Sequence, residues 1–208
     1  FEEEAHAMSL PPGTLLAERY RLGDVLGEGG MGVVYRGTDT ETAGSQWAIK
    51  VLNRRMKDTD IQREVQASTR LTHPNIRIVR ALETDSKHGV SFLLMELLEG
   101  QPLSTFVAEH GALKPLTEFR EVMVQIADAL AHAHELRIVH RDLKPENVFI
   151  CSGPPQLKVK LMDFGIAKML DDGSQASRVV GTPAFMAPEQ LGMGDKRVTP
   201  PTIPSCSG

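Results

Sequence analysis

The pattern of apolar positions in the first half of the chain predicts strands with one helix among them. Short alternating or β-branched runs predict strands over residues 20–26, 33–36, 46–52, 76–82 and 90–94. A capping box with Thr59 at the N-cap and Gln62 three residues later predicts a helix that runs to about Leu71. The expected unit is a small lobe of five strands and one helix.

From Pro102 onward the period of the apolar positions changes to that of helices. A short helix is expected from Leu103, and a longer one over 116–136, where apolar residues recur at helical spacing. Two short apolar runs, 148–150 and 157–162, predict a hairpin. The fold class is therefore α+β, with two lobes, the second mostly helical.

Composition adds limits to this picture. The 208 residues carry a net charge of -4, which provides no basic field for nucleic acid, and 41% of them are hydrophobic. Two cysteines, Cys151 and Cys206, make no disulfide framework. No apolar run reaches the length of a membrane span, so we expect a cytoplasmic protein. Residues 1–14, which contain an acidic cluster and a Pro-Pro-Gly turn, predict a flexible leader.

The segment 138–150 has the composition of a reactive loop. Asp142, Lys144 and Asn147 fall within six positions. A carboxylate can accept a hydroxyl proton, a lysine can neutralise phosphate charge, and an amide oxygen can ligate a hard cation. This set favours phosphoryl transfer.

A second candidate site is the sequence G-x-G-x-x-G-x-V at residues 27–34. Dinucleotide-binding proteins share its first six positions, but there a helix follows, whereas β-branched residues here predict a second strand. At a hairpin tip the glycine amides can approach the phosphates of a nucleotide. The strand that follows and the lack of a βαβ pattern argue against a dinucleotide-dependent enzyme. A glycine-rich hairpin without a ligand remains the alternative for this segment alone.

Together these patterns resemble the Hanks-type protein serine/threonine kinases, and the residues within the motifs are similar to those of the bacterial branch. The resemblance rests on the glycine loop, on W-A-I-K at 47–50, on H-R-D-L-x-x-x-N at 140–147, on D-F-G at 163–165 and on A-P-E at 187–189. It implies ATP and Mg²⁺ as cofactors and a protein with Ser or Thr hydroxyls as substrate. It also implies the lobe boundaries, 15–98 for the first lobe and 99–192 for the second.

The resemblance assigns roles to individual residues. Asp142, Lys144, Lys50 and Glu64 would be catalytic, with Glu64 paired to Lys50. Asn147 and Asp163 would hold the metal ion. The residues expected to bind ATP are Leu26, Gly27, Glu28, Gly29, Gly30, Met31, Gly32, Val33, Val34, Ala48, Lys50, Met95, Glu96, Leu98 and Phe149.

The segment after D-F-G is similar to a kinase activation loop. Arg141 precedes the catalytic aspartate, and kinases of that kind often need an anion on this loop. Ser174 and Ser177 are the candidate phosphorylation sites, and Thr182 would seat the substrate.

The resemblance extends from about residue 20 to residue 190. The later helices of the family have no counterpart, so we expect a second lobe that lacks its final helices. Residues 193–208 are expected to form a disordered tail because their prolines rule out a continuous helix. Two hypotheses follow: an active protein kinase, or a truncated ATP-binding regulatory fragment with weak or no activity.

Overall fold

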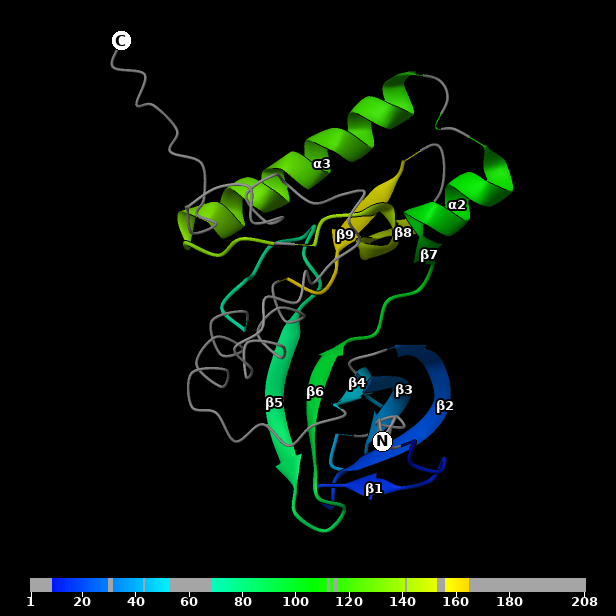
Figure 1. Ribbon diagram of the computed structural model, residues 1–208, viewed down its shortest axis with the longest axis vertical. Helices are drawn as coiled ribbons and strands as arrows, with labels where there is room; N and C mark the ends of the chain where they lie inside the picture. Colours follow the sequence, from blue (N-terminus) through cyan, green and yellow to red (C-terminus); the bar gives the residue numbers. More distant parts are fainter. Residues whose placement is uncertain are drawn as a thin grey trace, which may run out of the picture. The chain divides into compact units, whose positions relative to one another are not determined.

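The computed structural model describes residues 9–29, 32–42, 44–52, 69–111, 113, 116–140, 142–152 and 156–164. The chain forms two compact units (Figure 1). The first unit comprises residues 1–70 and 77–99, and the second comprises residues 71–76 and 100–208. The six residues 71–76 thus interrupt the first unit and belong to the second.

A six-stranded antiparallel sheet forms the described part of the first unit (Figure 1). Its strands are β1 (Leu15–Leu16), β2 (Tyr20–Gly29), β3 (Gly32–Asp39), β4 (Gln46–Leu52), β5 (Val79–Asp85) and β6 (Val90–Glu96), in the order β1-β2-β3-β4-β6-β5. The five predicted strands are all present, and the two-residue β1 extends the sheet to six. Residues 59–68 of the predicted helix lie outside the described residues.

Strand β5 begins three residues later than the sequence pattern predicted. Ile76 was expected to open it, but this side chain is 1% exposed in the core of the second unit. Its backbone forms a bridge with Leu161 there. The apolar run 76–82 therefore contributes residues to both units, and its periodicity alone does not show where one contribution ends and the other begins.

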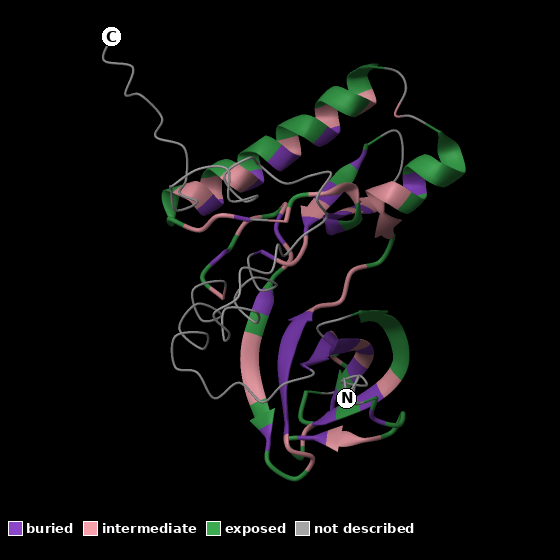
Figure 2. Ribbon diagram, in the orientation of Figure 1, coloured by how far each residue is buried: buried purple, intermediate pink, exposed green. Residues whose placement is uncertain are grey.

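Alternate residues of the strands fill the core of the first unit, because successive side chains of a strand point to opposite faces. Strands β4 and β6 are buried along most of their length (Figure 2). Tyr20 packs edge-on against Phe92, with ring centroids 5.8 Å apart. The core cluster consists of Leu10, Leu16, Tyr20, Leu22, Val33, Tyr35, Ile49, Val51, Val90, Phe92 and Leu94.

The last residues of the predicted leader contact this sheet. Leu10 is buried, and its backbone N–H donates to the Tyr35 hydroxyl over 2.8 Å. The N–H of Gly13 donates to the carbonyl of Leu22 over 2.7 Å. The prediction of a flexible leader over 1–14 is therefore wrong for residues 9–14, because Leu10 gains burial that a solvated tail would forgo.

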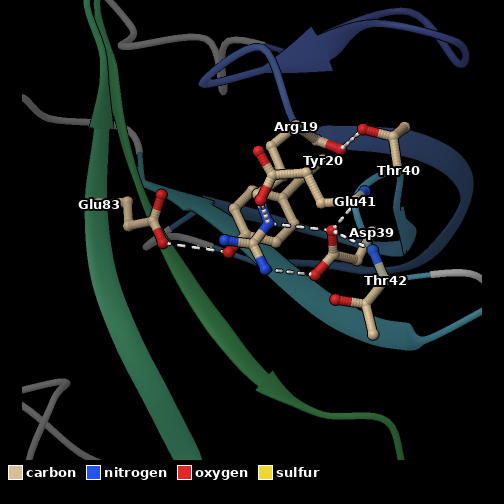
Figure 3. A network of polar contacts seen from close by, with 7 residues as sticks. All are labelled: Arg19, Tyr20, Asp39, Thr40, Glu41, Thr42 and Glu83. Atoms are coloured by element: carbon tan, nitrogen blue, oxygen red, sulfur yellow. Dashed lines mark hydrogen bonds and ion pairs between the residues drawn. The ribbon is translucent and has the colours of Figure 1, made fainter.

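A polar network ties the turn before β2 to the turn after β3 (Figure 3). The Arg19 guanidinium donates to both carboxylate oxygens of Asp39, over 2.9 and 2.7 Å. The Thr40 hydroxyl donates to the Arg19 carbonyl, and the N–H of Glu41 donates to Asp39. The Arg19 guanidinium holds the pKa of the Asp39 carboxyl well below its usual range, so this carboxyl stays ionised at neutral pH.

The second unit combines helices with a three-stranded sheet (Figure 1). Its elements are β7 (Gln101–Pro102), α2 (Leu103–His110), α3 (Leu116–Glu135), the 3₁₀ helix η1 (Pro145–Asn147), β8 (Val148–Ser152) and β9 (Lys158–Leu161), and the sheet order is β7-β8-β9. Both predicted helices and the predicted hairpin are confirmed.

Helix α3 places one face in the core of the second unit. Val122, Ile126, Ala129 and Ala133 are buried on this face at helical spacing (Figure 2). Phe119, which follows the same apolar pattern, is 48% exposed. None of the helices in the described part of the chain is both long and apolar enough to span a membrane. The predicted tail and the residues after Phe164 lie outside the described residues.

Candidate functional site

Asp142, Lys144 and Asn147 converge in the second unit, as the loop composition predicted. The Asn147 amide nitrogen donates to the Asp142 carboxylate over 2.9 Å and to its backbone carbonyl over 2.8 Å. The Lys144 ammonium lies 3.1 Å from the same carboxylate oxygen. The side chains of Asp142 and Lys144 are 19% and 21% exposed, so the pair is partly shielded and still reachable from solvent.

Asn147 also connects this loop to the end of β9. Its N–H donates to the carbonyl of Lys144, which closes η1, and its carbonyl accepts from the N–H of Met162, both over 2.9 Å. Asn147 is 8% exposed. The next residue after Met162 is Asp163, so the two predicted metal ligands are joined through one backbone hydrogen bond.

The donor set suits a hard cation. The amide nitrogen of Asn147 is engaged with Asp142, which leaves the amide oxygen as the group that could bind a metal ion. Asp163 adds a carboxylate, and oxygen ligands of this kind are what Mg²⁺ prefers. The residues present therefore fit the predicted metal.

Asp163 has a strained backbone, and the next side chain is buried. The φ angle of Asp163 is 54°, a left-handed conformation that costs energy for a residue with a Cβ atom. Phe164 is 3% exposed and its ring lies 4.5 Å from that of His140. Burial lowers the pKa of His140, so this imidazole is neutral at pH 7.

In the first unit, the glycine-rich segment forms a hairpin, as predicted. Gly29 pairs with Gly32 across β2 and β3, while Gly30 and Met31 lie outside the described residues. Gly32 has a φ of 144°, and a Cβ atom there would overlap the carbonyl oxygen of Val51. Glycine is therefore required at this position both by conformation and by the close approach of β4.

Lys50 lies in the middle of this sheet. It pairs with Val34 on β3 and Leu93 on β6, and it is 9% exposed. Ala48 and Met95, predicted to line the nucleotide site, are direct cross-strand partners and are buried. Glu64, the predicted partner of Lys50, lies outside the described residues, so this pairing stays a prediction.

The remaining predicted nucleotide contacts differ in exposure. Leu26 is 45% exposed on β2, and Leu98 is half-buried just after β6. Phe149 is half-buried on β8, between Pro102 and Lys160. Phe149 belongs to the second unit, and the other described candidates belong to the first.

Sequence reasoning missed Arg77 next to the predicted adenine-binding segment. The Arg77 Nε donates to the backbone carbonyl of Glu96 over 3.0 Å. The N–H of Glu96 donates to the carbonyl of Ile78, and its carboxylate accepts from the N–H of Ile78. The only feature of the sequence that could have drawn attention to Arg77 is its position between two isoleucines, Ile76 and Ile78.

Comparison with known proteins agrees with these features. Residues 20–202 match the family model described as "Protein kinase domain". The chain is 40% identical over 190 residues to the DNA damage-responsive serine/threonine-protein kinase RqkA of Deinococcus radiodurans, covering 88% of this chain and 28% of RqkA. It is 38% identical over 191 residues to the serine/threonine-protein kinase PkaA of Streptomyces coelicolor, covering 84% of this chain and 35% of PkaA. The chain therefore spans about a third of these relatives or less.

Solved structures show the same likeness. The kinase domain of Mycobacterium tuberculosis PknI superposes with a TM-score of 0.63 at 29% identity, covering 81% of this chain and 71% of that one. Rad53 in complex with AMP-PNP superposes with a TM-score of 0.66 at 32% identity, covering 81% of this chain and 41% of that one. The arrangement of strands and helices is therefore that of these kinases.

Proposed function

Because this chain belongs to the Hanks-type protein kinase family, we propose that it transfers the γ-phosphoryl group of ATP to serine and threonine hydroxyls of proteins. The observation that carries this proposal is the cluster of Asp142, Lys144 and Asn147. The Asn147 amide nitrogen lies 2.9 Å, and the Lys144 ammonium 3.1 Å, from the same carboxylate oxygen of Asp142. A serine/threonine specificity is further supported by the names of the bacterial relatives.

Each residue of the cluster has a distinct task in this proposal. The Asp142 carboxylate accepts the proton of the attacking hydroxyl and aligns its oxygen with the γ-phosphorus. Lys144, which pairs with Asp142 before substrate binds, turns its ammonium to the transferred phosphoryl oxygens as charge develops on them. Asn147 keeps Asp142 in position through its amide nitrogen.

Asn147 and Asp163 would hold the metal ion. When bound, Mg²⁺ neutralises charge on the phosphates and helps to orient them for in-line transfer. The protein's contribution is to fix these two ligands at the ends of η1 and β9. The backbone hydrogen bond from Met162 to Asn147 supports this assignment.

The first unit would bind the nucleotide. The amides of the glycine-rich hairpin would approach the phosphates, and Lys50, paired with Glu64, would neutralise their charge. Met95, Glu96 and Leu98 would line the adenine site. The burial of Lys50 within a sheet supports this proposal, since a buried lysine is retained where it serves a partner or a ligand.

We also propose that Ser174 or Ser177 is phosphorylated on the loop after D-F-G and that Thr182 seats the substrate hydroxyl. Mass spectrometry of the protein after incubation with ATP would locate the phosphate. Serine-to-alanine changes at 174 and 177 should lower both the phosphate content and the activity.

A cytoplasmic location is proposed as well, because ATP is available there, and cell fractionation would test it.

The kinase proposal is tested by an isosteric change that removes proton acceptance. Asp142→Asn should lower kcat for transfer of radiolabelled phosphate to a generic basic protein by roughly 10²–10⁴-fold. Binding of a fluorescent ATP analogue should persist, because Asp142 is not among the residues proposed to bind the nucleotide. Glu109→Gln, an exposed change on α2, is the control that should retain full activity.

Two outcomes would contradict the proposal. Equal rates for the parent chain and Asp142→Asn would show that the measured transfer does not use this carboxylate. Nucleotide binding without any transfer by the folded parent chain would instead support an ATP-binding regulatory fragment.

A further inference from the structure

The outer edge of β9 has no neighbouring strand; side chains cover most of it, and a single backbone bridge joins Leu161 to Ile76. On one side β9 pairs with β8. On the other side, Leu157, Val159 and Leu161 turn their backbone polar groups toward residues from α3 and from the segment 71–76. These three residues are at most 1% exposed, so their backbone groups have no access to water and need protein partners.

Gln125 of α3 supplies the first set of partners (α3 and β9 are seen side by side in Figure 1). Its amide nitrogen donates to the carbonyl of Leu157 over 2.7 Å, and its amide oxygen accepts from the N–H of Val159 over 3.1 Å. A second, longer bond of 3.3 Å runs from the same nitrogen to the carbonyl of Glu121. The side-chain amide of Gln125 therefore donates and accepts as a backbone amide in a neighbouring strand would.

Asn75 continues this edge toward the end of β9. Its amide nitrogen donates to the carbonyl of Val159 and to the Gln125 amide oxygen, both over 2.8 Å. Its backbone carbonyl accepts from the N–H of Leu161 over 2.8 Å. The two amide side chains are thus bonded to each other and to three outward-facing groups, the Leu157 carbonyl and the N–H and carbonyl of Val159, while the Asn75 backbone takes the Leu161 N–H.

The segment that carries Asn75 is itself fixed to α3. His73 Nε2 lies 3.2 Å from the carboxylate of Asp128, and His73 Nδ1 accepts from the N–H of Asn75 over 3.2 Å. Leu71 and Ile76 at its two ends are in the core of the second unit. The contacts of His73 with α3 and the burial of Leu71 and Ile76 therefore fix the position of Asn75 beside β9.

The register of β9 determines the position of Asp163. Only Met162 separates Leu161 from Asp163, and its N–H donates to the carbonyl of Asn147. A shift of β9 by one residue would reverse which side chains face the core and would break this bond. Within the described residues, the amide pair supplies most of the side-chain hydrogen bonds on the outer edge of β9 that oppose such a shift. The backbone bridge between Ile76 and Leu161 and a 3.5 Å bond from the Lys160 ammonium to the Ile76 carbonyl add to them.

We propose that Asn75 and Gln125 act as a side-chain substitute for a fourth strand and that they position Asp163 for binding of the metal–nucleotide complex. The proposal rests on the kinase function proposed above. Neither residue touches substrate, so both are positioning residues, and Gln125 is the more informative because its side chain alone makes the contacts.

The test uses Gln125→Glu in the full chain. Glutamate has nearly the same shape, but it cannot donate to the Leu157 carbonyl, and its charge would face that oxygen. We expect faster hydrogen exchange of the amides in 157–163 and a roughly tenfold higher Mg²⁺ concentration for half-maximal transfer, as for other residues that orient a metal ligand. Gln125→Met, which removes both bonds without adding charge, should change both quantities in the same direction.

Ala127→Gly, an exposed change two residues further along α3, is the matched control. It weakens the helix through backbone entropy, and it touches neither β9 nor Asn75. If it raised the Mg²⁺ requirement as much as the Gln125 variants do, general loss of stability would explain the result and the proposal would be overturned.

A readout without catalysis separates this inference from the kinase proposal. Binding of Mn²⁺ in the presence of a non-hydrolysable ATP analogue, followed by electron paramagnetic resonance, should weaken in both Gln125 variants. If the parent chain binds Mn²⁺ and transfers no phosphate, the kinase proposal fails while the positioning role is still measured. Unchanged Mn²⁺ affinity together with unchanged exchange in 157–163 would refute the positioning role.

Discussion

Phe164 lies against His140, with the two ring centroids 4.5 Å apart and the planes at 54° to each other. Both side chains are buried, and neither ring nitrogen of His140 has a hydrogen-bond partner within the described residues. The neutral imidazole therefore behaves as an apolar ring between the reactive loop and the end of β9. Protonation would place a charge in this core, and the cost of burying that charge outweighs the attraction of Asp142 and Asp163.

The first prediction concerns pH. Because burial lowers the pKa of His140 in the folded state, the unfolded chain binds more protons as the pH falls. The contribution of His140 to the free energy of unfolding should be complete above about pH 6.5, the ordinary histidine value, and should be lost as the pH falls below it. Urea unfolding at a series of pH values would measure this slope.

His140→Leu should reduce the slope, since it removes the titrating group and keeps an apolar side chain. Ile138→Val, a nearby change without a titrating group, should leave the slope as it is. A His140→Leu slope equal to that of the parent chain would show that other groups cause the pH dependence.

The second prediction concerns the charge beside Asp142. Asn147→Asp would replace an amide nitrogen, 2.9 Å from the Asp142 carboxylate, with a second carboxylate oxygen. Two carboxylates at this distance raise the pKa of one of them. The pH–rate profile should therefore shift to higher pH, and kcat at neutral pH should fall by roughly 100-fold. Glu146→Gln, an exposed charge change in the same 3₁₀ helix, should leave the profile unchanged.

The third prediction compares two glycines of the same hairpin. Gly32→Ala should destabilise the protein by about 1–3 kcal/mol or more, because its φ of 144° is unfavourable for alanine and its Cβ would overlap Val51. Gly27→Ala should cost little stability, since a Cβ atom there meets nothing within 4 Å. Thermal unfolding of both variants measures the difference, and equal losses would contradict the close approach of β4 at Gly32.

The fourth prediction concerns acid unfolding. The pKa of Asp39 is lowered by Arg19, so the stabilising contribution of this carboxylate is present above about pH 4 and is lost as the pH falls toward its folded-state value. Asp39→Asn should be less stable than the parent chain at neutral pH, and the difference should narrow in acid. Glu41→Gln should change little, because Glu41 is 67% exposed. A difference independent of pH would exclude the charge as its cause.

The sequence alone was sufficient to predict most of the strands, the two helices of the second unit and the Asp142 cluster. Strand periodicity depends on neighbours in the chain, and Asp142, Lys144 and Asn147 lie close together in sequence. Arg77 and Gln125 were missed because their partners are backbone groups far along the chain: Arg77 bonds a carbonyl 19 residues away, and Gln125 bonds one 32 residues away. Every residue has a backbone carbonyl, so the amino-acid type at a position does not show that its carbonyl accepts a hydrogen bond from a distant side chain.

The leader was mispredicted for a related reason. Leu10 stands between Ser9 and Pro11, where no periodic pattern marks it as a core residue. Its burial depends on Tyr35, 25 residues later, whose hydroxyl accepts from the Leu10 N–H. The local composition correctly predicted an irregular segment. It could not show that tertiary contacts hold residues 9–14 against the sheet.

The chain passes between the two units three times, after residues 70, 76 and 99. A fragment that begins at residue 100 would therefore lack Leu71 and Ile76 from its core and Asn75 from the edge of β9. The two lobes cannot be exchanged between relatives by a single recombination event at the segment around residue 99. A working chimera needs the hexapeptide 71–76 to come from the same parent as the second lobe, so evolution is expected to vary that hexapeptide together with α3 and β9.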